Sequence, residues 1–317
     1  MSERMAFVRT ALEKLARVGR RANASNLTSE QSAQLAHLRE HGYVMFDHLV
    51  GTERLKQLQE QYRKRIEEDL NFEFPTLAQS RIDPTRDADL IKSNFLATPH
   101  TLAQRGLTFD RKDVKSYGQA VAEYEPSTLT TELPDTGDWL DLWLDPNVLP
   151  IAEAYFGFVP QMVEAYIRRN FPARFVVMNH AWHRDRNHET HLLKAFVFLS
   201  DCTLKTGPHH YIAGSVSDRR IDGKIYYSDD EIRSVYPESS GREIISVVPA
   251  GTIILEDTRG LHKAGMPDEG YRDLGYSTFV PPIALLNRGS LYKVSRKTFD
   301  KLTPAQQRYI PPANIVQ

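Results

Sequence analysis

Helical spacing of apolar residues organises the front of the chain. Thr28 followed by Gln31 is a capping-box pattern, which predicts a helix that carries Leu35 and Leu38 and ends near Gly42. Residues 43–50 are rich in apolar and aromatic side chains and predict a short strand. A second helix is predicted after it, because apolar side chains recur at helical spacing at Leu55, Leu58, Tyr62 and Ile66.

A basic amphipathic segment precedes this region, at residues 1–27. It places apolar side chains at helical spacing among basic ones, at Met5, Val8, Leu12 and Leu15. We interpret it as a solvated helix that covers part of the core, because such helices are common; a helix that binds a membrane surface or a partner is the alternative. We expect residues 28–317 to form one domain.

Short β-like runs replace the helical pattern in the second half. Residues 71–137 are interrupted by prolines and predict loops and short helices. From about Val163, short runs rich in Val, Ile, Phe and Tyr follow, at residues 174–178, 192–199, 243–248, 252–255 and 274–280. Several short strands without long intervening helices predict an antiparallel sandwich or jelly roll. The expected fold is mainly β, with flanking helices and a helical N-terminal portion.

Composition narrows the class of protein. The chain has 317 residues, of which 41% are hydrophobic, enough to bury a sizeable core. Lys and Arg total 40 against 41 for Asp and Glu, so no global field favours nucleic acid or an anionic membrane. The single cysteine, Cys202, excludes an intramolecular disulfide and a Cys-rich zinc site and suits a reducing compartment. Because no apolar run reaches the roughly 18 residues of a membrane span and no signal peptide is recognisable, we expect a cytoplasmic protein.

Two metal-binding side chains stand close together at His183 and Asp185. Positions i and i+2 lie on the same face of an extended strand, so both side chains can chelate one ion. His262, after a later strand-like run and a turn, offers a third ligand. Two histidines and one carboxylate on a β scaffold form the facial triad of non-haem iron(II), whereas zinc more often takes a closed or three-histidine site.

One arginine follows the third ligand at a suitable place. Arg272 stands at the start of the last strand-like run, where its guanidinium can bind a carboxylate through two hydrogen bonds. Arg259, three residues before His262, is the alternative, and we expect it to lie in the turn.

These segments resemble the phytanoyl-CoA dioxygenase family of iron(II) and 2-oxoglutarate oxygenases. The similar segments run in the family's order over roughly residues 28–283: an early strand at 43–47, a first metal motif at 182–185, a turn and strand at 207–215, and a second metal motif at 257–262.

The resemblance implies a double-stranded β-helix (jelly roll, cupin-like) with its core at about residues 160–283. It implies Fe(II) held by His183, Asp185 and His262, and 2-oxoglutarate bound by Arg272. It also implies that O2 activation is coupled to conversion of 2-oxoglutarate to succinate and carbon dioxide. In related enzymes a hydroxyl residue two positions beyond the arginine often helps to bind the cosubstrate, whereas this chain has Leu274, so a second anchor must come from elsewhere.

Other histidines and arginines crowd the same region. We expect His188 and His191 to belong to a polar loop, and His209 and His210 to be packed or exposed at the start of a strand. None of these, nor His180, is expected to bind metal. Most nearby arginines are expected at a solvated surface. Of the neighbours Arg168 and Arg169, at most one can point inward from a strand. Lys92, Asn94 and Lys194 are further polar candidates.

The function predicted from these residues is oxidation, most simply hydroxylation, of a small-molecule substrate. A halogenase on the same scaffold is disfavoured, since such enzymes carry a small residue in place of Asp185. A cupin-like binding or sensor protein and a zinc hydrolase are the rivals from other classes.

Overall fold

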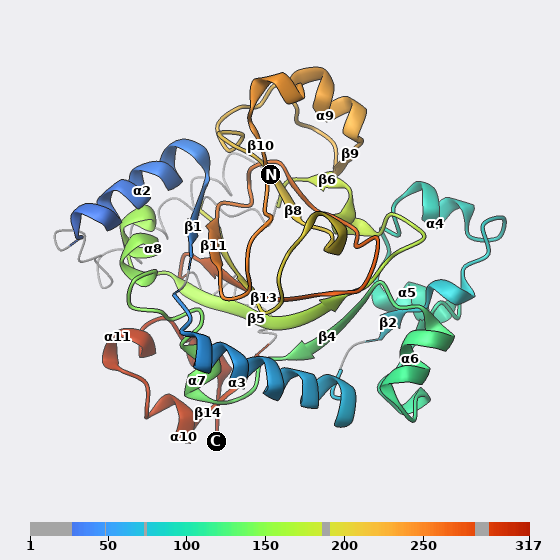
Figure 1. Cartoon of the computed structure of the whole chain (residues 1–317), viewed down its shortest axis with the longest axis horizontal. Coiled ribbons are helices and arrows are strands. Elements are labelled where there is room, and N and C mark those ends of the chain that lie inside the picture. Colours follow the sequence, from blue (N-terminus) through green and yellow to red (C-terminus); the bar gives the residue numbers. More distant parts are fainter. Residues whose placement is uncertain (1–26, 48, 73–74, 186–190, 283–291) are drawn as a thin grey trace, which may run out of the picture.

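Two antiparallel sheets stacked face to face form the centre of the protein in the computed structural model, which describes all residues except 1–26, 48, 73–74, 186–190 and 283–291 (Figure 1). Side chains from the two sheets meet between them: the rings of Phe196 and His209 lie 4.9 Å apart. This arrangement confirms the predicted mainly β jelly-roll fold with flanking helices. The predicted basic helix at residues 1–27 lies outside the described residues except for Leu27.

The larger sheet has the strand order β1-β11-β7-β13-β5-β4 within the described part of the chain. Its strands are β1 (Tyr43–Phe46), β4 (Thr128–Glu132), β5 (Gln161–Asn170), β7 (Leu193–Phe198), β11 (Ile253–Glu256) and β13 (Arg272–Val280). The smaller sheet has the order β10-β8-β12-β6-β9 over the same residues. Its strands are β6 (Trp182–His183), β8 (His209–Ile212), β9 (Tyr226–Tyr227), β10 (Glu243–Ile245) and β12 (His262–Ala264). Two short strand pairs lie outside these sheets, β2 (Thr76–Leu77) with β3 (Thr108–Phe109) and β14 (Val294–Ser295) with β15 (Ile315–Val316).

Helices lie around the outer side of the larger sheet (Figure 1). They are α2 (Ser29–His41), α3 (Thr52–Arg63), α6 (Tyr117–Tyr124), α7 (Gly137–Leu140), α8 (Leu149–Phe156), α10 (Arg296–Phe299) and α11 (Pro304–Gln307). Three helices lie elsewhere: α4 (Ala88–Lys92), whose Lys92 shares a pocket with Trp182 and Tyr226 of the smaller sheet, α5 (Pro99–Gln104), which contacts β3, and α9 (Asp229–Val235), which lies beyond the smaller sheet. The main hydrophobic core lies on that outer side, where Leu193, Ala195 and Val197 of β7 join the helices.

Side chains of the larger sheet alternate between its two faces, and the two faces differ in composition. On β7, Phe196 and Phe198 belong to a second apolar cluster between the sheets, together with Leu274 and Tyr276 of β13. Because successive side chains of a strand point to opposite faces, Lys194 and Arg272 share that inner face. The inner face therefore combines these two cations with an apolar cluster, and the outer face carries the bulk of the core.

Most predicted elements are present, with two exceptions. Residues 71–137, predicted as loops and short helices, also contain the strands β2, β3 and β4, and β4 pairs with β5 in the larger sheet. The capping box of Thr28 and Gln31 opens α2, and Gly42 ends it in a left-handed conformation with φ 89°. The strand predicted at residues 174–178 is wrong. That segment is a loop that leads into the 3-10 turn η5 (Met178–His180), and Met178 takes a positive φ of 41° while its N–H donates to the Asn94 carbonyl. Its apolar residues cover a neighbouring loop instead of pairing in a sheet.

Candidate metal centre

Three side chains converge between the sheets to form a cluster that could hold a metal ion. One ligand atom each from His183, Asp185 and His262 lies within 4.8 Å of the others. His183 in β6 and His262 in β12 are directly opposite each other in the antiparallel pair, so both rings point to the same face. Asp185 lies just beyond β6, where its N–H donates to the Thr258 carbonyl at 2.9 Å. The chain thus brings together the three ligands predicted from the sequence.

Backbone carbonyls orient both imidazoles. Nδ1 of His183 lies 2.9 Å from the Ala181 carbonyl oxygen, and Nδ1 of His262 lies 3.1 Å from that of Gly260. A carbonyl can only accept, so each Nδ1 carries the proton and each Nε2 keeps its lone pair on the side of Asp185. Burial also lowers the pKa of each imidazole below its ordinary value, which keeps both rings neutral. Neutral, oriented imidazoles are what a metal ion requires.

Lys194 is the cation next to the cluster. Its Nζ lies 2.6 Å from Oδ2 of Asp185, the oxygen that also faces Nε2 of His262 at 3.9 Å. Burial favours a higher pKa for Asp185, but the positive charge and hydrogen bond of Lys194 outweigh it, and the pKa lies well below its ordinary value. Asp185 is therefore an anion and available as a ligand.

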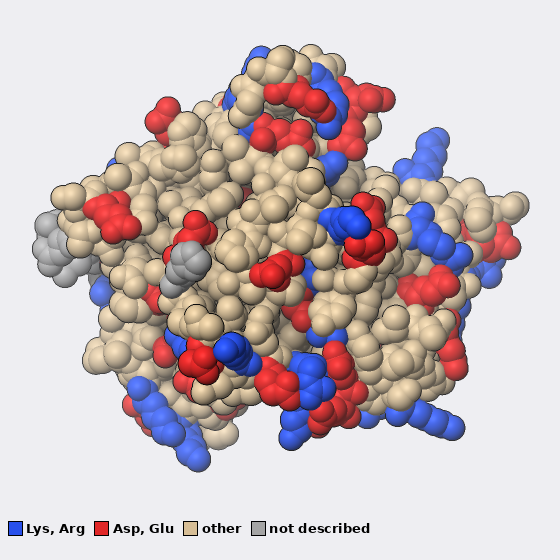
Figure 2. Space-filling view, viewed as in Figure 1, with Lys and Arg blue, Asp and Glu red and all other residues tan. Residues whose placement is uncertain are grey.

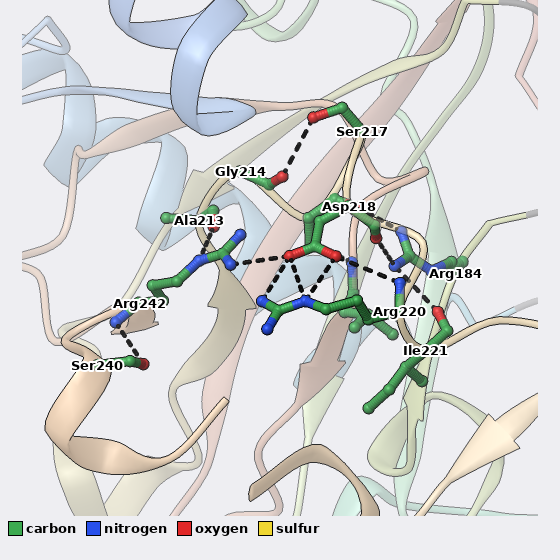
Figure 3. Close-up of polar contacts among 11 residues, drawn as sticks. Arg184, Ala213, Gly214, Ser217, Asp218, Arg220, Ile221, Ser240 and Arg242 are labelled. Atoms are coloured by element: carbon green, nitrogen blue, oxygen red, sulfur yellow. Dashed lines mark hydrogen bonds and ion pairs between the residues drawn. The ribbon is translucent and has the colours of Figure 1, made fainter. Parts of the chain in front are cut away.

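Arg184, between two of the three residues, holds their segment in place (Figure 3). It is buried, and its guanidinium donates to the backbone carbonyls of Ser215, Asp218, Ile221 and Arg259 at 2.6 to 3.2 Å. Figure 3 shows a second set of contacts in the loop that contains Ser215, Asp218 and Ile221: the Asp218 carboxylate accepts hydrogen bonds from Arg220 and Arg242.

The same loop also supports the other histidine. Ser215 Oγ accepts a hydrogen bond of 2.7 Å from the N–H of Leu261, next to His262. One loop therefore supports both segments of the candidate metal cluster.

Arg272 is buried without an anionic partner. Its side chain is 1% exposed, and Nε and Nη1 have no hydrogen-bond partner among the described residues. Burial lowers the pKa of its guanidinium. An uncompensated buried cation is costly, and within the described residues Arg272 has no anion that offsets this cost. Leu274, two positions on, is buried and apolar, so it offers no second polar anchor.

Arg259 has partners of its own. Its guanidinium pairs with Asp257, with Nε 2.8 Å from Oδ1, and lies beside the Tyr155 hydroxyl. Unlike Arg272, it is already neutralised.

The neighbouring histidines have other partners. His209 lies 3.0 Å from Oε2 of Glu256, and burial lowers its pKa to about 3 while raising that of Glu256 well above the ordinary value. Burial therefore disfavours the charged form of both groups, and the two side chains share a hydrogen bond. His210 contacts Glu243 at 2.7 Å, and His191 packs against Phe156. His188 lies outside the described residues.

The arginines divide between surface and interior. Arg174, Arg219 and Arg220 are exposed, as predicted for most of them, but Arg169 and Arg184 are buried. Nothing in their sequence context distinguished the buried ones. Glu256 was likewise not predicted at the site; its place at the end of an apolar run was the available signal, and the structure puts it opposite Lys194 of β7.

The surface visible in Figure 2 mixes both signs of charge. Exposed ion pairs account for part of this pattern, such as Arg63 with Glu60 at 2.7 Å on α3. None of the helices in the described residues is both long and apolar enough to cross a membrane.

Comparison with known proteins supports the fold. No protein-family model and no curated protein matches the chain. Solved structures do match. The non-haem alpha-ketoglutarate-dependent carbocyclase SnoK from nogalamycin biosynthesis aligns with a TM-score of 0.50 and 16% identity over 81% of this chain and 85% of its own. The epimerase SnoN, solved with Fe3+, alpha-ketoglutarate and nogalamycin RO, aligns with a TM-score of 0.51 and 12% identity over 81% and 89%. The chain thus has the fold of the non-haem alpha-ketoglutarate-dependent enzymes.

Proposed function

We propose that this chain is an iron(II)- and 2-oxoglutarate-dependent oxygenase, of the phytanoyl-CoA dioxygenase type, that oxidises a small metabolite. The observation that carries the proposal is the combination, between the two sheets, of the His183, Asp185 and His262 cluster with the buried guanidinium of Arg272, which has unpartnered nitrogens among the described residues.

The residues fit both cofactors. Two neutral imidazoles and one carboxylate are the donor set that non-haem iron(II) takes while keeping positions open. The Arg272 guanidinium, with two free N–H groups, suits the distal carboxylate of 2-oxoglutarate. When bound, iron and 2-oxoglutarate supply oxygen activation: substrate, O2 and 2-oxoglutarate give hydroxylated product, succinate and carbon dioxide.

The protein's own contribution is positioning. The two Nδ1–H donations fix the imidazole planes, and Lys194 orients one oxygen of Asp185. Asp185 also argues against a halogenase, which needs a small residue at that place.

The test is to load the full chain anaerobically with iron(II), add 2-oxoglutarate, oxygen and a metabolite library, and measure succinate. We expect some compounds to stimulate succinate formation and to gain an oxygen atom, and the Asp185→Ala variant to do neither. If the iron-loaded wild type does not bind 2-oxoglutarate, the proposal is wrong; if it binds both and no compound is oxidised, a sensor function is favoured.

A further inference from the structure

Arg168 is an inner-face cation that the proposed function does not use. It lies in β5, opposite Leu274 of β13. Arg272 lies two residues before Leu274 on β13, so the two arginines are diagonal neighbours on the same face. Its neighbour Arg169 points to the outer face, where it pairs with Asp273 at 2.8 Å. Of the two adjacent arginines, therefore, one is neutralised and the other faces the space beside the metal cluster.

Two tyrosine rings hold the Arg168 guanidinium in place. Its Cζ lies 4.7 Å from the ring centroid of Tyr166 and 5.0 Å from that of Tyr276, and it donates to the Tyr166 hydroxyl at 3.1 Å. Its buried Nε has no hydrogen-bond partner, and no carboxylate of the described residues lies within ion-pair distance. Stacking of this kind fixes a guanidinium while leaving its edge free for a planar anion.

The position of Arg168 connects it to the metal cluster. The Tyr276 ring beside it is also contacted by Lys194, whose Nζ lies 5.4 Å from the centroid and which bonds Asp185. A molecule held by Arg168 would therefore lie along Tyr276 toward the metal ligands. Leu274 and Phe196, in the same apolar cluster, flank that path.

Other cations of the inner face already have an assigned anion. Lys194 lies 2.6 Å from Asp185 and near Glu164, which accepts from Thr278 on the same face at 2.9 Å. Arg272 is assigned to 2-oxoglutarate in the proposed function. Arg168 has no carboxylate within ion-pair distance among the described residues, so it is available for a further anion.

A surface pocket of about 520 Å³ lies beside His180 and Tyr226. His180 lines it and lies close enough to Arg168 and Arg272 for their charges to lower its pKa. Tyr226, also in the lining, has its ring 6.1 Å from that of His183. The lining includes exposed apolar side chains as well as Lys92: Leu96 is 46% exposed and Val176 is 37% exposed. Asn94 in the lining and Met178 beside it both have positive φ, a strained backbone of the kind found at functional sites.

We propose that Arg168 binds a carboxylate of the primary substrate, a monoanionic acid whose apolar part lies along Tyr276 toward the metal cluster. The inference rests on the proposed function, and it names the substrate class for that site.

The test uses matched pairs of small probes. Butanoate, hexanoate, octanoate, phenylacetate and 3-phenylpropanoate are each compared with their primary amides for binding to the full chain loaded anaerobically with iron(II) and 2-oxoglutarate. Calorimetry gives the affinity, and the metal-to-ligand absorption band reports 2-oxoglutarate. We expect at least one acid to bind about tenfold or more tightly than its amide, as loss of a charge-assisted bidentate contact implies.

The variants separate the outcomes. Arg168→Met should abolish the preference for acid over amide, Arg168→Lys should keep part of it, and the exposed control Arg219→Met should keep all of it. The 2-oxoglutarate band should be unchanged in all of them. The inference is wrong if no acid is preferred by the wild type, or if Arg168→Met keeps the preference. It is also wrong if Arg168→Met loses the 2-oxoglutarate band instead, since Arg168 would then be a cosubstrate anchor. Absence of that band in the wild type contradicts the proposed function itself.

Discussion

Arg272→Met should make the apo protein more stable and its 2-oxoglutarate affinity much lower. The guanidinium is 1% exposed, and two of its N–H donors have no partner among the described residues. Each unsatisfied buried donor costs about 1 to 3 kcal/mol, so an apolar side chain of similar length should raise the apo free energy of unfolding by an amount of that order. Central β13 keeps its backbone pairing with β5 and β7, so the fold should persist.

The loss in binding should be larger than the gain in stability. Removing one partner of a desolvated charge pair costs about 2 to 5 kcal/mol, which corresponds to a thirtyfold to several-thousandfold weaker affinity. Denaturant unfolding of the apo protein gives the first quantity, and anaerobic titration of the iron-loaded protein, followed by the metal-to-ligand band, gives the second. Arg259→Lys is the matched control, because that arginine already pairs with Asp257, and its 2-oxoglutarate affinity should stay within about twofold.

Two results would refute this reasoning. Unchanged 2-oxoglutarate affinity in Arg272→Met, with weakened affinity in Arg259→Lys, would show that the cosubstrate arginine is misassigned. A loss of several kcal/mol in apo stability would show that the Arg272 guanidinium has structural partners after all.

Three further variants probe the surrounding residues. Asp185→Ala should fold but lose oxidation and bind iron weakly, because two histidines no longer fix the metal; normal product formation would contradict the triad. His180→Gln should keep its iron stoichiometry. Since burial and nearby arginines lower the pKa of folded His180 to about 4, the unfolded chain takes up its proton first as pH falls below about 6.5. Between pH 7 and 5, the free energy of unfolding of the wild type should therefore fall by on the order of 2 kcal/mol more than that of His180→Gln. The same pH dependence of the free energy of unfolding in both proteins would exclude this. Arg169→Met should destabilise the fold by about 3 to 5 kcal/mol, because Asp273 is left buried and unpaired, with unchanged 2-oxoglutarate affinity in calorimetry; a stable variant would refute the pairing.

Local sequence patterns were sufficient where local chemistry decides the structure. The capping box of Thr28 and the glycine at position 42 define α2 at both ends, and both can be read from single residues. The spacing of His183 and Asp185 likewise predicted two neighbouring ligands. What brings His262 to them is the pairing of β6 with β12, a long-range register that spacing along the chain does not encode.

The misassigned segment at residues 174–178 shows where prediction from local composition fails. Its composition suits a strand, but the two large sheets take their strands from elsewhere, and Met178 bonds the carbonyl of Asn94 in a loop distant in sequence. Tertiary contacts thus override a β-like composition, because strand propensity mainly reflects packing against neighbours.

Four buried or inward-facing arginines show why function must be argued from partners and not from residue type. Arg169 forms an ion pair with Asp273, and Arg184 donates hydrogen bonds to backbone carbonyls of one loop, so both stabilise the fold. Arg272 and Arg168 lie on the inner face with donors that no described residue satisfies. An unpaired, desolvated guanidinium lowers the stability of the folded state. We propose bound molecules as the source of the anions that complete these two arginines, and at these two positions we expect affinity and specificity to respond to mutation.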